Sequence, residues 1–423
     1  MRAVVIAIIG LLTGVVSAQP APHQHAGSGS ETAKGSGSGS GSDAVQESSP
    51  DEPDALLPPP PPLPPAPKPT PAPTAPAPAP TGAHTMDEVI VPRSTLAFGI
   101  NFFGDTSALV TSPATPHTSF QLGALALRIL GDLSPSVDAL TEFALETKES
   151  GQSTDVEQLA VRWRKGPGQL EVGRFHTELG FWNTAYHHGL WLQMPIERPH
   201  VVRFEDDNGL IPAHWVGAHY TLQGDVGADG KLALITGLGN GRGKILDDVR
   251  VVGDTNEAKA VLVKVRFKNP AVELGAGLLF DRIAPADATI RPALPGQEID
   301  EYDGNVYGVV HAGGVIAIGE GYVFRHQAGT QTWMTYAGFG VLGYAVTEWF
   351  RPYAVLDVIH GADGDPFFHP DPMMSPTLDV TEVIAGARFE TSTWSAVKLE
   401  FRVDRVPGTD TSFTGIANWS WGL

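Results

Sequence analysis

Residues 397–403 read Val-Lys-Leu-Glu-Phe-Arg-Val, in which apolar and charged side chains alternate without exception. Successive side chains of a β-strand point to opposite faces, so this segment would have one apolar face and one ionic face. Similar alternation recurs toward the N-terminus, for example over residues 261–268 and 272–281, which are separated by a short Asn-Pro-Ala turn. The pattern predicts an all-β chain of two-faced strands from about residue 94 to the C-terminus.

The alternation predicts about sixteen strands. Their expected ranges are 94–103, 119–130, 136–147, 156–165, 169–176, 213–222, 231–238, 258–268, 271–281, 304–312, 314–326, 330–343, 350–360, 380–391, 395–405 and 412–423. Connections after odd-numbered strands are expected to be long, at 104–118, 177–212, 239–257, 282–303 and 361–379, with 327–329 as an exception. The other connections are short.

Long connections on one rim and short turns on the other are typical of outer-membrane barrels. Lipid offers no partner for unpaired backbone N–H and C=O groups, so a membrane-spanning sheet must close on itself. An even strand number returns both chain ends to the periplasm. We therefore expect residues 85–423 to form a closed antiparallel transmembrane β-barrel of about 16 strands.

A soluble β-sandwich is the alternative, because its strands alternate too. A sandwich protein of this length would normally divide into several domains joined by linkers. No linker composition interrupts residues 94–423. The barrel is the preferred interpretation.

The N-terminal part has a different composition. Arg2 precedes an apolar run that ends in small residues at Ala18, so residues 1–18 are predicted to be a removable signal peptide. Residues 19–84 contain a Gly/Ser-rich stretch followed by a Pro/Ala-rich stretch, and such compositions bury too little apolar surface to fold. We expect a disordered periplasmic spacer, with docking of the proline tract onto a partner as the alternative.

Composition excludes several kinds of chemistry. The chain has no cysteine, which rules out disulfides and thiolate metal or redox sites. Its 47 acidic residues against 28 basic ones argue against nucleic acid as a partner.

The last predicted strand, 412–423, places Phe413, Trp419, Trp421 and Leu423 on one face. This segment resembles the C-terminal insertion signal of bacterial outer-membrane proteins, although phenylalanine is usual where Leu423 stands. The resemblance implies outer-membrane lipid and the barrel assembly machinery as partners.

The longest connection follows the fifth strand, and residues 173–193 read Gly-Arg-Phe-His-Thr-Glu-Leu-Gly-Phe-Trp-Asn-Thr-Ala-Tyr-His-His-Gly-Leu-Trp-Leu-Gln. Residues 173–220 resemble the corresponding region of porin-like outer-membrane proteins related to the phosphate-selective porins. In many porins the third long loop folds into the lumen and narrows it, so the resemblance implies a pore constriction at 177–212. The candidate constriction residues are Arg174, Glu178, His187, His188, Glu197, Arg198, His200 and Arg203.

The apolar content of this loop also indicates that it enters the barrel. Phe181, Trp182, Tyr186 and Trp191 make it too apolar to remain in water, so it should pack against the inner wall.

Five histidines, His176, His187, His188, His200 and His214, raise the question of a metal site. Adjacent His187 and His188 would usually point apart, and no His-Glu-x-x-His spacing occurs. Polar or packed histidines are the preferred interpretation, and neither a metal nor another cofactor is predicted.

The alternation of inward and outward positions along each strand also predicts which charged side chains line the lumen. They are Arg162, Arg164, Glu171, Lys264, Arg266, Glu273, Arg388, Lys398, Glu400 and Arg402. Rings of Arg and Lys would favour anions, but acidic residues face the lumen as well. Anion preference is therefore a hypothesis that rests as much on the family resemblance as on charge.

We expect a porin that allows passive diffusion of small hydrophilic solutes or ions, with a homotrimer suggested by analogy alone. No nucleophile is recognisable, and the loop carboxylates are better explained as ion-pair partners of its arginines, so the chain is not expected to be an enzyme. The alternative is a non-conducting outer-membrane barrel that serves as an adhesin, a structural anchor or a barrel enzyme. A soluble secreted β-protein ranks third.

Overall fold

The computed structural model describes residues 98–112, 117–148, 151–187, 189–248, 253–254, 256–368 and 378–423. The predicted signal peptide and the low-complexity segment at 19–84 lie outside the described residues, and so does His188.

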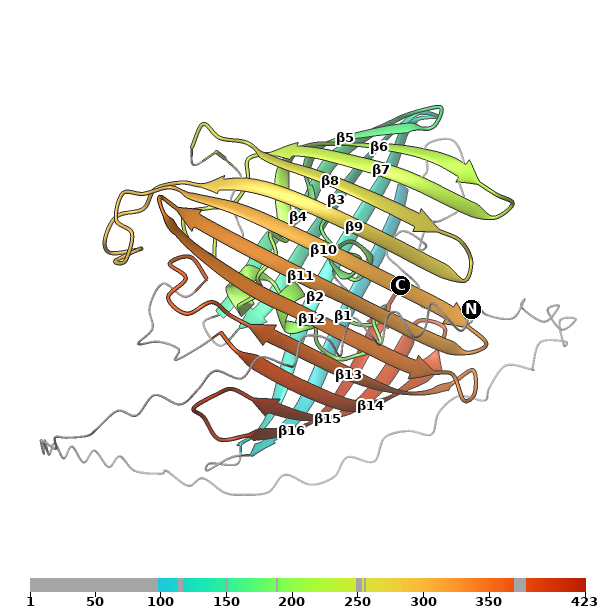
Figure 1. Ribbon diagram of the computed structural model, residues 1–423. Helices are drawn as coiled ribbons and strands as arrows, with labels where there is room; N and C mark the ends of the chain where they lie inside the picture. Colours follow the sequence, from blue (N-terminus) through green and yellow to red (C-terminus); the bar gives the residue numbers. More distant parts are fainter. Residues whose placement is uncertain are drawn as a thin grey trace, which may run out of the picture. The chain divides into compact units, whose positions relative to one another are not determined.

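Sixteen strands form one closed antiparallel barrel in the described residues, and each strand pairs with its neighbours in sequence (Figure 1). Their bounds are β1 Phe98–Ser112, β2 His117–Ser134, β3 Val137–Lys148, β4 Gly151–Lys165, β5 Gly168–His176, β6 His214–Val226, β7 Gly230–Gly239, β8 Ala260–Lys268, β9 Val272–Ile283, β10 Ile299–Ala312, β11 Val315–Ala328, β12 Gln331–Tyr344, β13 Phe350–His360, β14 Val380–Ser392, β15 Ser395–Arg405 and β16 Ser412–Gly422. The predicted fold class and strand number are confirmed.

The first and last strands close the cylinder. β1 pairs with β16 from Phe103 opposite Gly422 to Ser112 opposite Phe413. The chain end takes part, because the N–H of Leu423 donates to the carbonyl of Phe102 at 2.8 Å and the N–H of Phe102 donates back at 2.9 Å. No edge is left between these two strands, as a sheet in lipid requires.

Long connections follow β5, β7, β9 and β13, as predicted, but β1 and β3 are followed by short ones. The first connection was predicted to span 104–118, but β1 and β2 continue pairing and leave only residues 113–116 between them. The pairing shifts register there, because β2 has one more residue between Leu122 and Leu125 than β1 has between Gly104 and Thr106. The β11–β12 connection is a tight turn, as predicted.

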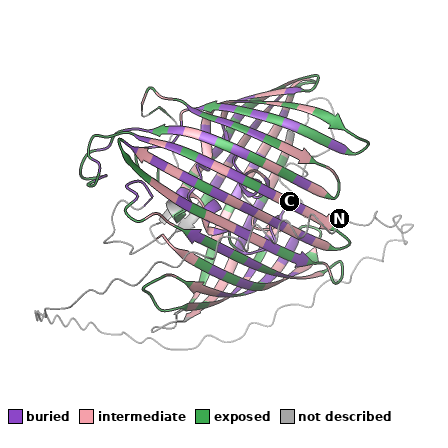
Figure 2. Ribbon diagram, viewed as in Figure 1, coloured by how far each residue is buried: buried purple, intermediate pink, exposed green. Residues whose placement is uncertain are grey.

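Burial follows the two faces of each strand. On β15 the charged side chains of Lys398 and Arg402 are buried, whereas Leu399 is 47% exposed and Phe401 52% exposed. Figure 2 shows the same alternation of buried and exposed positions along most strands. The outer face is therefore apolar and the inner face ionic, as expected for strands that meet lipid outside. Among the described residues, no helix is both long and apolar enough to span a membrane.

Part of the inner wall is apolar instead. Ile318 and Phe324 on β11, Phe339 on β12 and Val355 on β13 all point inward and are buried. The β5–β6 connection covers them and forms one hydrophobic core with them.

Candidate functional site

The connection between β5 and β6, residues 177–213, crosses the interior of the barrel, and we call it the crossing loop (Figure 1, green). It contains one turn of helix, α2 Trp182–Ala185, and two short 3-10 helices, η1 His200–Val202 and η2 Glu205–Asp207. In the closed strand order, β13 and β14 lie on the opposite side of the ring from β5 and β6. Contacts between the loop and those strands therefore show that it spans the lumen.

The start of the crossing loop is fixed by two charged wall residues. The carboxylate of Glu320 on β11 accepts the backbone N–H groups of Phe181 at 3.0 Å and Trp182 at 2.7 Å. The ammonium group of Lys264 on β8 donates to the carbonyl of Gly180 at 2.7 Å. These charge-assisted bonds satisfy free backbone groups at the beginning of α2.

The middle of the loop is held by basic residues of the far wall. Lys398 on β15 donates to the carbonyl oxygens of Leu190 and, at 3.1 Å, of Pro195. Arg388 on β14 donates to the carbonyl of Gln193 at 2.8 Å. Two residues predicted to line the lumen thus bind backbone groups of the loop.

Carboxylates of the same wall hold the next segment. Glu400 on β15 accepts the N–H of Ile196 at 2.7 Å. Asp357 on β13 accepts the N–H of His200 at 2.5 Å and also contacts Nδ1 of its ring at 2.9 Å. Wall residues of both charges therefore hold the loop backbone. Basic side chains bind its carbonyl oxygens, and carboxylates bind its N–H groups.

Apolar side chains fill the space between these anchors. Trp182 is fully buried and meets Phe339 of β12 edge-to-face, with ring centroids 5.4 Å apart. Leu179, Val201 and Ile211 have no exposed surface either. The predicted packing of the loop aromatics against the inner wall is observed.

The predicted constriction residues that the structure describes range from buried to exposed. His187 and Arg198 are buried inside the loop, and the guanidinium of Arg198 donates to the backbone carbonyls of His187 and Val202. Burial lowers the pKa of Arg198 to about 10, although the neighbouring carboxylate of Glu205 opposes this shift. Arg174 is also buried and lies at the end of β5.

Glu178, His200 and Arg203 are partly exposed, and Glu197 is more exposed than these three. The side chain of Glu197 is 47% exposed and bonds to Arg402 at 2.6 Å and to Arg203 at 3.1 Å. The surrounding loop and wall partly desolvate Glu197, which acts to raise its pKa, but these two cations outweigh that effect and lower the pKa overall. Burial likewise acts to raise the pKa of Glu178, while Lys264 on the wall, 2.9 Å away, leads the opposing charges that lower it to about 2.

The ten predicted lumen residues all lie on inward-facing positions of their strands. Arg162 and Arg164 both contact the carboxylate of Asp138. Glu171 lies 3.3 Å from the ring of His219 on β6. Lys264, Glu273, Arg388, Lys398, Glu400 and Arg402 are buried, and Arg266 is partly buried.

A polar cavity of about 60 Å³ lies between the crossing loop and the wall formed by β2 to β6. Its lining is Arg128, Leu140, Gln158, Arg162, Glu171, Phe175, His176, Glu178, Thr184 and His219. The loop therefore packs with apolar groups toward β11–β13 and leaves polar groups around a space on the opposite side.

Sequence reasoning missed Glu320 and Asp357 as loop anchors. Both occupy inward positions of correctly predicted strands. The residues around them are apolar on both faces of the strand, so the alternation did not indicate which face was inside. In the described residues, two groups also bring three possible metal ligands together: His176, His187 and His214, and His200, Asp357 and Glu382.

Comparison with known proteins supports the fold. The chain matches no model of a known protein family. No curated protein matches it by sequence. Among solved structures it is similar to Salmonella typhi OmpF in complex with daunomycin, with 11% identity, a TM-score of 0.53, and coverage of 78% of this chain and 98% of that one.

In-vitro folded OmpT, an outer membrane protein of Vibrio cholerae, matches with 10% identity, a TM-score of 0.51, and coverage of 78% of this chain and 99% of that one. The trimer form of OmpT matches at 12% identity and a TM-score of 0.50, covering 77% of this chain and 100% of that one. The fold is that of a porin-like barrel. These matches do not support the phosphate-selective porins in particular.

Proposed function

We propose that this chain is an outer-membrane porin that allows passive diffusion of small hydrophilic solutes or ions. The observation that carries the proposal is the crossing loop, which is anchored across the lumen by charged wall residues and leaves a polar cavity beside β2–β6. Solutes would pass along this polar side, because the opposite side is packed with apolar groups. The similarity of fold to porins is consistent with this assignment.

The location follows from the same proposal. The outward apolar face would contact outer-membrane lipid after insertion by the barrel assembly machinery, with residues 19–84 in the periplasm. One of the similar structures is a trimer form of OmpT, and a homotrimer is our proposal for this chain as well. We propose no catalytic role.

Selectivity is expected to be weak. The cavity lining sets Arg128 and Arg162 beside Glu171 and Glu178, so charges of both signs face the same space. Opposed charges give a transverse field and only modest discrimination between ions. Anion preference stays a hypothesis, which the reversal potential under a salt gradient tests directly.

Single-channel recording in planar bilayers tests the function. Refolded protein should give defined conductance steps, and deletion of residues 181–192 should enlarge them, because this deletion removes α2 with its contact to Glu320 and Leu190 with its contact to Lys398. An unchanged step size after the deletion would show that the crossing loop does not limit the passage.

A non-conducting barrel is the second candidate, and the complete burial of the loop core favours it. Adhesion, structural anchoring or a barrel enzyme would then be the role. Wild-type protein that inserts into bilayers, shows heat-modifiable mobility in detergent gels and yet carries no current would establish this alternative.

A further inference from the structure

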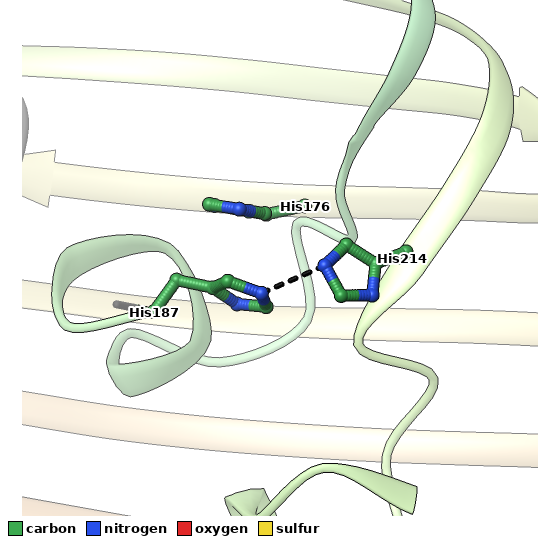
Figure 3. Close-up of side chains that lie close together, drawn as sticks. All are labelled: His176, His187 and His214. Atoms are coloured by element: carbon green, nitrogen blue, oxygen red, sulfur yellow. Dashed lines mark hydrogen bonds between the residues drawn. The ribbon is translucent and has the colours of Figure 1, made fainter. Parts of the chain in front are cut away.

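Three histidines meet where the crossing loop joins the barrel (Figure 3). His176 is the last residue of β5 and pairs in register with His214, the first residue of β6. His187 comes from the loop, and its Nε2 lies 2.8 Å from Nε2 of His214. The ring of His187 stacks on that of His176 with centroids 3.5 Å apart, and one ligand atom from each histidine lies within 4.8 Å of the others.

Glu157 of β4 adds a carboxylate to this group. Its Oε2 lies 2.5 Å from Nε2 of His214 and 3.7 Å from Nε2 of His187. The β3–β4 pairing shifts register between Glu142 and Phe143, and this bulge leaves both Glu157 and its neighbour Gln158 buried. A bulge that redirects one side chain is a common device at functional sites.

Asn183 fixes which nitrogen of His187 is available as a ligand. Its side-chain nitrogen, Nδ2, donates to the backbone carbonyls of Thr177 at 2.9 Å and Ala213 at 3.1 Å, so both of its N–H groups are used. Its Oδ1 accepts a bond from Arg198 at 3.2 Å and lies 3.1 Å from Nδ1 of His187. Since Oδ1 can only accept, Nδ1 of His187 must carry a proton, and the lone pair of the neutral ring lies on Nε2.

This arrangement is the one that metal-bound histidines show. A ligating imidazole usually donates its other N–H to a carbonyl or carboxylate, which fixes its tautomer and orientation. The Nε2 lone pair of His187 points at Nε2 of His214 and toward Glu157.

We propose that His176, His187, His214 and Glu157 bind a divalent transition-metal ion of the zinc class. Three imidazoles and one carboxylate supply four ligands, which is the number a closed tetrahedral zinc site uses. Ligand atoms around zinc are about 3.3 Å apart at Zn–N distances of about 2.0–2.1 Å. Binding therefore requires Nε2 of His187 and Nε2 of His214 to separate from 2.8 Å, and the ring of His176 to turn out of its stack on His187 so that its lone pair points at the same ion. The ion would cross-link the loop to β4, β5 and β6.

The second group of possible ligands does not support a similar proposal. His200 and Asp357 already bond to each other, and Asp357 also accepts the backbone N–H of His200. Their contact is explained as a loop anchor. His200 is therefore a suitable control, since it lies in the same loop and is not part of the three-histidine group.

The access route agrees with the proposal. His176 lines the polar cavity beside β2–β6, so an ion in the lumen can reach the group without opening the barrel wall. Imidazole and carboxylate ligands suit Zn²⁺, and they also suit Ni²⁺, Cu²⁺ and Co²⁺. The ligand types therefore do not identify the ion, and competition between these ions for the site would.

Titration of the refolded full chain in detergent with Zn²⁺, after treatment with a chelator, tests the site. Wild-type protein should bind one tight equivalent, and Co²⁺ should give the strong visible absorption of four-coordinate cobalt. His187→Gln and His214→Gln should each weaken Zn²⁺ binding by about 100-fold or more, and Asn183→Ala by about 10- to 100-fold, because Asn183 positions a ligand without being one.

His200→Gln should bind Zn²⁺ as the wild type does. Heat-modifiable mobility in detergent gels shows whether each variant has folded, and variants that fail this test are replaced by His187→Asn and His214→Asn. The proposal is wrong if folded wild-type protein binds no tight equivalent. It is equally wrong if His187→Gln and His214→Gln retain wild-type affinity, or if His200→Gln loses as much affinity as they do.

Discussion

Glu320→Gln is expected to loosen the crossing loop while leaving the barrel closed. The carboxylate of Glu320 accepts three bonds, from the N–H groups of Phe181 and Trp182 and from the hydroxyl of Tyr322 at 2.6 Å. Glutamine has the same shape but offers one acceptor oxygen, and its amide nitrogen would face at least one of these donors.

The size of the effect follows from this count. Hydrogen bonds to a charged group contribute about 1.5–3 kcal/mol each, against about 0.5–1.5 kcal/mol for neutral pairs. Only the bonds from Phe181 and Trp182 hold the loop, and the substitution weakens one of these two and breaks the other, which costs about 3–4 kcal/mol. Because about 1.4 kcal/mol corresponds to a tenfold change, the population with an opened loop should rise by about a hundred- to a thousandfold.

Hydrogen exchange of the amides of Phe181 and Trp182 measures this opening directly, since both donate to Glu320. Exchange at both sites should accelerate by the same factor, and open-channel noise should increase. Glu273→Gln is the matched control, because the carboxylate of Glu273 is also buried on the wall but bonds to Tyr307 of β10 rather than to the loop.

Two results would refute this reasoning. Unchanged exchange at Phe181 and Trp182 in Glu320→Gln would mean that Glu320 does not hold the start of α2. Equal acceleration in Glu273→Gln would mean that loss of any buried wall carboxylate loosens the loop, so that the specific contacts would not be responsible.

Two further predictions concern the wall. Gly173→Ala should prevent folding or destabilise the barrel by about 3 kcal/mol or more, because Gly173 has φ of +138° and a Cβ would lie 2.1 Å from the carbonyl of Leu159. Gly415→Ala, where a Cβ meets nothing within 4 Å, should be neutral, and heat-modifiable mobility compares the two. Arg162→Gln removes one of the cations beside Asp138 and should shift the reversal potential toward cation selectivity, whereas an unchanged potential would exclude this part of the wall from the ion path.

The strands could be predicted because alternation is a property of each segment by itself. The segment 395–405 was predicted with the bounds that the structure gives, and its inward and outward residues were assigned correctly. Bulges mark the limit of this approach. At Glu157 an extra residue in β4 reverses the alternation, so the sequence alone could not show that this carboxylate is buried.

The site was predictable only in part. The loop's position between the fifth and sixth strands and its aromatic content indicated that it enters the lumen. Its partners were not predictable, because Phe181 and Glu320 are 139 positions apart and no local pattern connects them. The three histidines illustrate the same limit, since His176 and His214 become neighbours only through the pairing of β5 with β6.

The apolar inner wall and the crossing loop explain each other. On β11 the outward-facing residues between Val315 and Val323 are small or apolar, and the inward-facing residues include Ile316, Ile318 and Phe324. A strand whose two faces both meet apolar surroundings needs no polar face, which is why the alternation of polar and apolar residues is weakest here. Without the docked loop these inward side chains would meet water, at a cost of about 25 cal/mol for each Å² of apolar surface. Docking of the loop therefore removes a penalty that closure of the barrel would otherwise create, and the two steps should be thermodynamically coupled.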